Sequence, residues 1–337
     1  MSVQVTPAMS VIVISPDSYS TVRKTIRRLR VQSVSHQLEI VLVVAAAQGA
    51  NIDCAELNSF SGIHIVEIGD MTSTARARAA GVQRATAPVV AFVEDHSFPA
   101  KGWAEALIHA HRQPWAAVGP VMANANPHSL VSWANLLIEY AEWMEPAPAG
   151  VAEHLPGHNS TYKRAFLLEY GERLEAMLEA ESILQWDLRA KGHQLYLEPA
   201  AKTYHQNFSA PFSWFFLRLD GGRLFAASRA RTWSPLRRLL YAFSAPLIPF
   251  VRFRRIVGEL RRPGRARHLM PRVLPLLFAG LVVDGTGEMI GYACGVGNAM
   301  RRLSDMEFHR ERCPLNQGQS IMSSPCESGL NWLQQRY

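Results

Sequence analysis

The sequence PVVAFVEDHSFP, residues 88–99, places an uninterrupted apolar run directly before three acidic or imidazole side chains. A continuous run of β-branched and other apolar residues is typical of a strand that is buried on both faces of a sheet. The apolar pattern of residues 88–93 therefore predicts a buried strand. The triplet Glu94-Asp95-His96 then predicts a polar cluster at the carboxyl end of that strand.

Three further apolar runs precede this strand, with helical patterns between them. We expect strands at residues 10–14 (SVIVI), 38–44 (LEIVLVV) and 63–68 (IHIVEI), and helices at residues 21–31 and 74–87. Strands that alternate with helices predict an α/β domain with a parallel sheet covered on both faces. Ligands of such sheets bind beyond the carboxyl ends of the strands. Ser15, Pro16 and Asp17 should therefore lie on the same edge as the triplet.

The charge of the chain is divided unevenly along its length. The 337 residues carry a net charge of +7. Residues 209–303 contain 16 arginines, no lysine and four acids, a net charge of +12, which leaves −5 for the remainder. This asymmetry predicts an acidic domain, residues 1–208, followed by a basic region, residues 209–303, with an anionic partner. The polar residues 304–337 are predicted to form a flexible tail without catalytic groups.

The cysteines and the start of the chain indicate the compartment. The four cysteines are scattered and form no CxxC pair; they are Cys54, Cys294, Cys313 and Cys326. This pattern favours a reducing compartment over a disulfide framework or a structural zinc site. The first apolar run, residues 11–14, is too short for a signal peptide, so we expect none.

Five segments, in order, resemble those of family 2 glycosyltransferases, which have the GT-A fold. They are residues 10–33 (SVIVISPDSYSTVRKTIRRLRVQS), 77–81 (ARAAG), 89–103 (VVAFVEDHSFPAKGW), 156–164 (PGHNSTYKR) and 180–192 (AESILQWDLRAKG). The resemblance spans about residues 8–208. It implies that residues 1–208 form a Rossmann-like nucleotide-diphospho-sugar transferase domain.

The resemblance also implies that a divalent metal ion, Mn²⁺ or Mg²⁺, steadies the diphosphate of a nucleotide-sugar donor. The candidate metal ligands are Asp95, His96 and His205, and an imidazole ligand favours Mn²⁺ over Mg²⁺. The candidates for donor binding are Ser15, Pro16, Asp17, Arg78, Glu94 and Asp95. The alternative interpretation of the triplet is a strand-end turn with solvated charges. The donor stays open between UDP- and GDP-sugars, because the second strand ends in alanines where the family usually has acids.

Glu181 is the candidate general base, because the register counted back from Gly192 places it where the family has its catalytic carboxylate. Glu179 is the alternative if the register is shifted. The candidates for acceptor binding are His158, Asn159 and Trp186, and those for the diphosphate are Arg218 and Arg223. Core packing for Trp186 and lipid phosphate for the two arginines are the alternatives.

The basic region contains two long apolar runs. Residues 239–251 (LLYAFSAPLIPFV) are too few to span a bilayer, which needs about 20 helical residues. Residues 273–300 are longer but include Asp284 and Glu288, which are costly in lipid unless they face protein or water. We therefore expect peripheral, monotopic or re-entrant attachment to the cytoplasmic face of the inner or plasma membrane, with arginines on anionic headgroups. We expect no nucleic-acid partner, because the aromatic residues cluster with aliphatic ones and do not interleave with arginines.

These patterns together predict an inverting, metal-dependent glycosyltransferase. Its acceptor is expected to be a lipid-linked or polysaccharide molecule in cell-envelope or exopolysaccharide synthesis. The alternative is a non-catalytic member of the same fold that binds nucleotide or scaffolds an assembly at the membrane. The altered acidic triplet, the alanines at the end of the second strand and the Glu at the catalytic position keep this alternative open.

Overall fold

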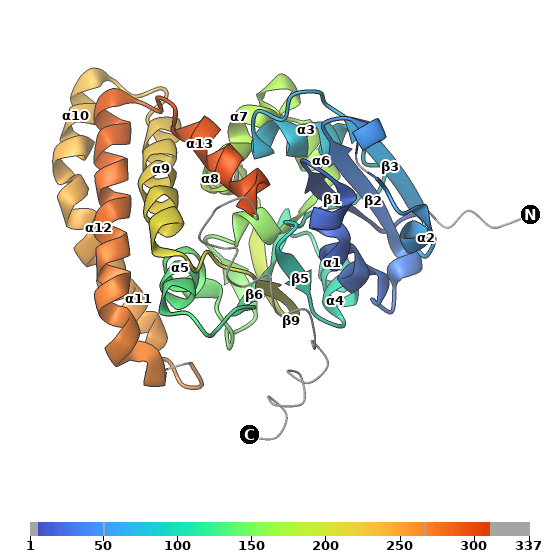
Figure 1. Cartoon of the computed structure of the whole chain (residues 1–337), viewed down its shortest axis with the longest axis horizontal. Coiled ribbons are helices and arrows are strands. Elements are labelled where there is room, and N and C mark those ends of the chain that lie inside the picture. Colours follow the sequence, from blue (N-terminus) through green and yellow to red (C-terminus); the bar gives the residue numbers. More distant parts are fainter. Residues whose placement is uncertain (1–5, 50, 266, 311–337) are drawn as a thin grey trace, which may run out of the picture.

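The computed structural model describes residues 6–49, 51–265 and 267–310. Most of the predicted tail, residues 311–337 with Cys313 and Cys326, lies outside the described residues. Figure 1 shows a sheet with its covering helices at one end of the molecule and a group of long helices at the other.

The sheet has nine strands, in the order β3-β2-β1-β4-β8-β6-β9-β5, with β7 paired to β9. In chain order the strands are β1 (Met9–Ser15), β2 (Leu38–Val44), β3 (Gly62–Glu67), β4 (Val89–Phe92), β5 (Ser97–Pro99), β6 (Ala117–Asn124), β7 (Gly150–Ala152), β8 (Thr161–Lys163) and β9 (Leu195–His205). The four strands predicted from the sequence are confirmed and are parallel to one another. Beyond them the sheet is mixed, because β8 runs antiparallel to both β4 and β6.

Helices cover both faces of this sheet, as predicted. They are α1 (Tyr19–Arg30), α2 (Cys54–Leu57), α3 (Thr74–Arg84), α4 (Trp103–Ala110), α5 (Leu130–Tyr140), α6 (Arg164–Leu168), α7 (Leu174–Leu178) and α8 (Glu181–Ala190). Successive side chains of a strand point to opposite faces. Val11 and Val13 of β1 therefore pack in one core with α1 and α4. Ile12, between them, packs in a second core with α3, α7 and α8.

The basic region folds into long helices that share a third core with α5. They are α9 (Pro211–Arg229), α10 (Pro235–Ser244), α11 (Ile248–Leu260), α12 (Met270–Cys294) and α13 (Ala299–Phe308). Helices α9 and α12 lie side by side (Figure 1), and glycines permit their close approach. A Cβ atom on Gly222 would overlap the carbonyl oxygen of Asp284, and one on Gly287 would overlap that of Leu219.

The apolar segment that contains α12 and the path of α13 bear on the predicted membrane attachment and on the predicted tail. Among the described helices, the segment Arg267–Cys294 is long and apolar enough to cross a membrane, and 44% of its apolar window is buried inside the protein. Helix α13 then runs from the end of α12 back toward the sheet (Figure 1). The tail predicted to begin at residue 304 therefore starts inside a helix, where Ser304 and Phe308 are buried.

Candidate metal and donor site

A cavity of about 570 Å³ opens between the carboxyl ends of the strands and the long helices. Its sheet side is formed by residues that follow β1 and β4 and by the end of β9, namely Pro16, Glu94, Asp95, His96 and His205. Its other walls come from α5, α8, α9, α12 and α13. The parallel order of β1 and β4 brings Pro16 and the triplet to the same edge, as the sequence predicted.

Ser15 and Asp17, the neighbours of Pro16, have other partners. The Ser15 hydroxyl is buried and donates to the carbonyl of Ser18 at 2.8 Å, which shapes the turn after β1. A carboxylate oxygen of Asp17 lies 2.8 Å from Nδ1 of His309, just beyond α13. Pro16 is thus the member of this predicted donor turn that lines the cavity.

Thr25 of α1 fixes the loop that carries the triplet. Its hydroxyl is fully buried and lies 2.7 Å from the carbonyl oxygen of Asp95 and 3.1 Å from that of Ser97. A buried hydroxyl held between these carbonyl groups leaves the loop little freedom. The orientations of Glu94 and His96 therefore follow from the packing of α1 against the sheet.

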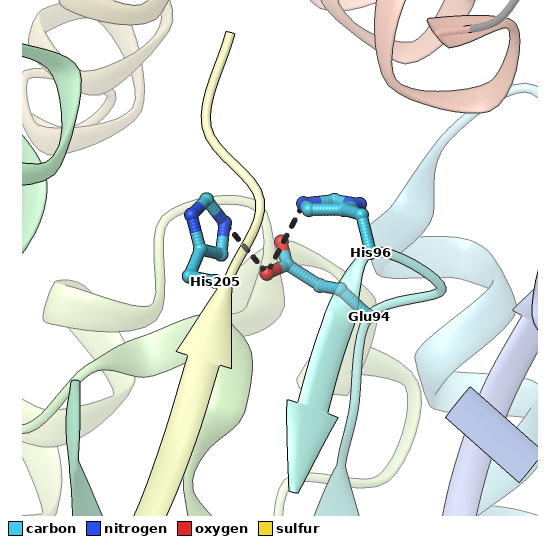
Figure 2. A group of neighbouring side chains, drawn as sticks. All are labelled: Glu94, His96 and His205. Atoms are coloured by element: carbon cyan, nitrogen blue, oxygen red, sulfur yellow. Dashed lines mark ion pairs between the residues drawn. The ribbon is translucent and has the colours of Figure 1, made fainter. Parts of the chain in front are cut away.

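Three side chains converge at the floor of the cavity, and Figure 2 shows them pointing toward one another. Glu94 Oε2 lies 3.5 Å from His96 Nε2 and 3.4 Å from His205 Nε2. One possible ligand atom from each of the three residues lies within 4.8 Å of the other two. Among the described residues, the buried Nε2 of His96 has no hydrogen-bond partner. A carboxylate and two imidazoles in this arrangement fit a divalent cation such as Mn²⁺.

The His205 ring is held in the tautomer that a metal ligand needs. Its Nδ1 lies 2.9 Å from the side-chain oxygen of Asn207, which can only accept, so Nδ1 donates. The Asn207 amide is fixed in turn by Asn135 and Asn124, at 3.1 and 3.2 Å. In the neutral ring Nε2, which faces the cluster, then carries the lone pair that a metal ligand needs, and such outer hydrogen bonds orient metal-binding histidines.

The carboxyl group of Glu94 is ionised. Burial opposes its charge, but the neighbouring imidazoles of His96 and His205 outweigh burial and hold the pKa of Glu94 well below its usual range. Asn159 also donates to Glu94 Oε2 at 2.8 Å. A carboxylate that is already deprotonated can bind a cation without losing a proton first.

Asp95 occupies a different place from its two neighbours. Its Oδ1 lies 2.6 Å from Nδ1 of His96, so it contacts the ring nitrogen that is not part of the cluster. Asp95 lines the cavity but does not join the converging group, and Glu94 joins it instead. A direct ligand role for Asp95 stays a prediction, whereas its contact with His96 orients that ring.

Arg78, His158 and Asn159, predicted for different substrates, lie close together. Arg78 is buried, and its Nη2 lies 2.9 Å from Nδ1 of His158. The same His158 nitrogen lies 3.6 Å from Glu94 Oε1. The His158 side chain therefore lies between the cationic Arg78 and the Glu94 carboxylate at the cavity floor, and contacts both.

Helix α8 forms the wall where the general base is predicted. The backbone neighbours of Glu181, Ala180 and Ser182, line the cavity, while the Glu181 side chain lies outside what the structure describes. Glu179, the alternative base, lines the same cavity but forms an ion pair with Arg231. Trp186 belongs to this wall as well, and its ring stacks against the guanidinium group of Arg229 at 5.4 Å.

The two arginines predicted to hold the diphosphate lie apart. Arg218 of α9 lines the cavity and forms a partly buried ion pair with Glu139 of α5. Arg223, one turn further on, donates from Nε to the carbonyl of Gly295 at 2.9 Å. Arg223 is not among the described residues that line the cavity, so the fold places only Arg218 near the predicted donor.

The acids of α12 face protein rather than lipid. Asp284 forms an ion pair with Arg252 of α11, and Glu288 Oε1 lies 3.8 Å from the same guanidinium group. Burial and the neighbouring Asp284 raise the pKa of Glu288 to about 7, against the opposing effect of Arg252. All three side chains of this ionic cluster line the cavity.

Sequence reasoning missed further residues at the cavity. Glu139 and Arg252 carry no motif, and Glu307 and Arg310 lie in the segment predicted to be a tail. No local signal could have found the last two, because α13 reaches the cavity through its packing against α9 and its contacts with the strand ends.

The sheet and the carboxylate–imidazole cluster at its carboxyl edge define an α/β domain of the GT-A class. Residues 10–171 match the family model described as glycosyl transferase family 2. Residues 10–171 therefore form a family 2 glycosyltransferase domain with the GT-A fold, and the resemblance seen in the sequence is confirmed for this part of the chain.

Several solved structures are similar at low identity. GalNAc-T7 with UDP, GalNAc and Mn²⁺ is 13% identical with a TM-score of 0.43, and the match covers 60% of this chain and 44% of that one. TarS 1-349 of S. aureus with UDP is 14% identical with a TM-score of 0.45, covering 84% and 90% of the two chains. The mannosyltransferase PcManGT of Pyrobaculum calidifontis with GDP-Man and Mn²⁺ has the same identity and TM-score, covering 94% and 84%. No curated protein matches the chain.

Proposed function

We propose that this protein transfers a sugar from a nucleotide-diphosphate donor to an acceptor hydroxyl, with a divalent metal held by Glu94, His96 and His205. The observation that carries the proposal is the buried Nε2 of His96, which has no hydrogen-bond partner among the described residues and faces an ionised Glu94 in a family 2 domain. Once bound, the metal supplies positive charge for the departing diphosphate. Mn²⁺ fits this pair of imidazoles better than Mg²⁺.

The remaining walls of the cavity suit the other parts of the reaction. Arg78 and Arg218 add positive charge beside the diphosphate, next to the predicted donor turn at Pro16. Glu181 on α8 takes the proton of the acceptor hydroxyl, and Trp186 and Asn159 position the acceptor. With base and leaving group on different walls, attack in line with the leaving bond inverts the anomeric centre.

An exposed apolar face on α10, α11 and the turn between them supports attachment to a membrane. Its large side chains, between 50% and 78% exposed, recur every three or four residues: Leu236, Leu239, Leu240, Phe243, Leu247, Phe250 and Val251. Arg237, Arg254 and Arg255 are exposed on the same helices. An apolar helical face flanked by arginines is typical of in-plane binding to anionic lipid. We therefore propose peripheral or monotopic attachment at the cytoplasmic face, and a lipid-linked or nascent-polysaccharide acceptor.

The double substitution Leu240→Glu/Phe243→Glu is expected to weaken binding to anionic vesicles at least about 100-fold, because each large apolar side chain contributes about 1.5–3 kcal/mol when buried. Co-sedimentation with phosphatidylglycerol-containing vesicles measures the effect. The matched control is Val31→Glu/Ile65→Glu, which changes two exposed apolar residues of the sheet domain and should leave binding unchanged. Equal binding by wild type and the α10 variant would contradict the attachment.

The transfer reaction is tested with a panel of UDP-, GDP- and dTDP-sugars in the presence of anionic vesicles. We expect one donor to release its nucleotide in Mn²⁺, release to stop in EDTA, and Mn²⁺ to restore it. Donor binding by calorimetry without release, with acceptor extracts supplied, would support the non-catalytic nucleotide-binding alternative. A protein that neither binds nor cleaves any donor would refute the proposed function.

A further inference from the structure

Glu307 brings a second carboxylate to the cluster of Glu94, His96 and His205. It lies in α13, and its Oε2 is 4.0 Å from Nε2 of His96, the buried nitrogen without a hydrogen-bond partner. Ligand atoms bound at about 2.0–2.2 Å to one cation lie about 3–4 Å from each other. A cation held by Glu94 and His96 is therefore within reach of Glu307 after a small movement of its side chain.

We propose that Glu307 is a fourth protein ligand of the metal, so that metal binding fastens α13 over the cavity. The inference rests on the proposed metal site at Glu94, His96 and His205. Two carboxylates and two imidazoles would neutralise a dication. They would also leave two positions of an octahedron for diphosphate oxygens.

The surroundings of α13 already direct Glu307 toward the cluster. Beyond the helix, His309 Nδ1 contacts Asp17 Oδ2 at 2.8 Å, and Arg310 Nη1 donates to the carbonyl of Gln206 at 2.7 Å. Asp17 follows β1 and Gln206 follows β9, so α13 is held to the strand ends on both sides of the cluster. Helix α13 also contacts α9, through the ion pair between Arg302 and Asp220. A metal bound to Glu307 would thus connect the helical part to the sheet.

Arg310 explains how Glu307 can lie next to Glu94 without a cation between them. Its Nε donates to Glu307 Oε2 at 2.8 Å, and this charge offsets the repulsion between two neighbouring carboxylates. The guanidinium group also stacks on Phe208 at 4.2 Å. Glu307 can therefore exchange part of its interaction with Arg310 for the metal while α13 stays in place.

The test measures Mn²⁺ binding to the full chain by calorimetry, without nucleotide. Glu307→Gln is expected to weaken Mn²⁺ affinity at least about tenfold, as loss of a metal-site group commonly does. Asp305→Asn, on the same helix with its side chain 77% exposed, should leave the affinity unchanged. Arg310→Gln, which removes the ion pair but keeps the ligand, should bind Mn²⁺ at least as tightly as wild type.

Hydrogen exchange of the α13 amides gives a second readout. Mn²⁺ should slow this exchange in wild type and in Asp305→Asn, and have no effect in Glu307→Gln. Wild-type affinity in Glu307→Gln, with binding abolished by Glu94→Ala, would overturn the ligand role of Glu307 and leave the proposed function standing. Equal loss of affinity in Glu307→Gln and Arg310→Gln would also overturn it, because docking of α13 would then be the cause. No Mn²⁺ binding by wild type would remove both proposals.

Discussion

Glu94→Ala is expected to lower donor turnover about 1,000-fold. Glu94 is the ionised carboxylate at the centre of the cluster, within 3.5 Å of both imidazoles. Without it the metal that offsets the leaving diphosphate is lost, and such charge stabilisation contributes several kcal/mol. A change of about 4 kcal/mol corresponds to three powers of ten in rate. The measurement is kcat/KM for nucleotide release at saturating Mn²⁺.

Two further variants show whether the loss of turnover in Glu94→Ala is specific to the charge of this carboxylate. Glu105→Gln removes an exposed carboxylate of α4, outside the cavity, and should keep wild-type turnover. Glu94→Gln keeps the size of the side chain and can still contact Asn159, so it separates lost charge from lost packing and should be nearly as inactive as Glu94→Ala. Turnover by Glu94→Ala within tenfold of wild type would exclude a central role for this carboxylate.

Arg252→Met is expected to lower the free energy of unfolding by about 3–5 kcal/mol at pH 7, because it leaves buried Asp284 and Glu288 without their cation. Removal of one partner of a buried pair costs far more than removal of both, since the remaining charge stays desolvated. Urea unfolding followed by circular dichroism measures the difference. Arg252 belongs to α11 and pairs with acids of α12. Loss of this ion pair should therefore reduce the stability of the helical part first.

The triple variant Arg252→Met/Asp284→Asn/Glu288→Gln is the matched control. It removes the acids together with their cation, and most of the lost stability should return. Arg254→Met, an exposed arginine on the same helix, should change stability by less than about 0.5 kcal/mol. If Arg252→Met were as stable as Arg254→Met, the ionic cluster would contribute nothing to the packing of α11 against α12.

The parallel half of the sheet, β1 to β4, could be predicted from the sequence because its signals are local. Residues 11–14 and 40–44 are apolar without interruption, which is typical of a strand buried on both faces. The edge position of the triplet followed from the rule that parallel strands end together. The mixed half of the sheet gave weaker signals, since β7 and β8 have only three residues each.

The candidate site could be predicted only in part. The sequence indicated His96 and His205, but the choice of Glu94 over Asp95 as the converging carboxylate depends on the loop held by Thr25. The pairing of Arg252 with Asp284 joins residues on two different helices. No pattern of neighbouring residues records such a contact, because it depends on how the helices cross.

The sequence by itself thus determined the α/β class, the family resemblance and the edge of the sheet at which the candidate site lies. These properties follow from the period of apolar residues and from short ordered motifs. The tertiary structure decided which side chains meet there. Glu307 and Arg310 lie about a hundred residues beyond His205, in a segment whose composition predicts a polar tail. They reach the cavity because α13 gains its buried surface from α9 and the strand ends, and that stabilisation exists only once the rest of the chain has folded.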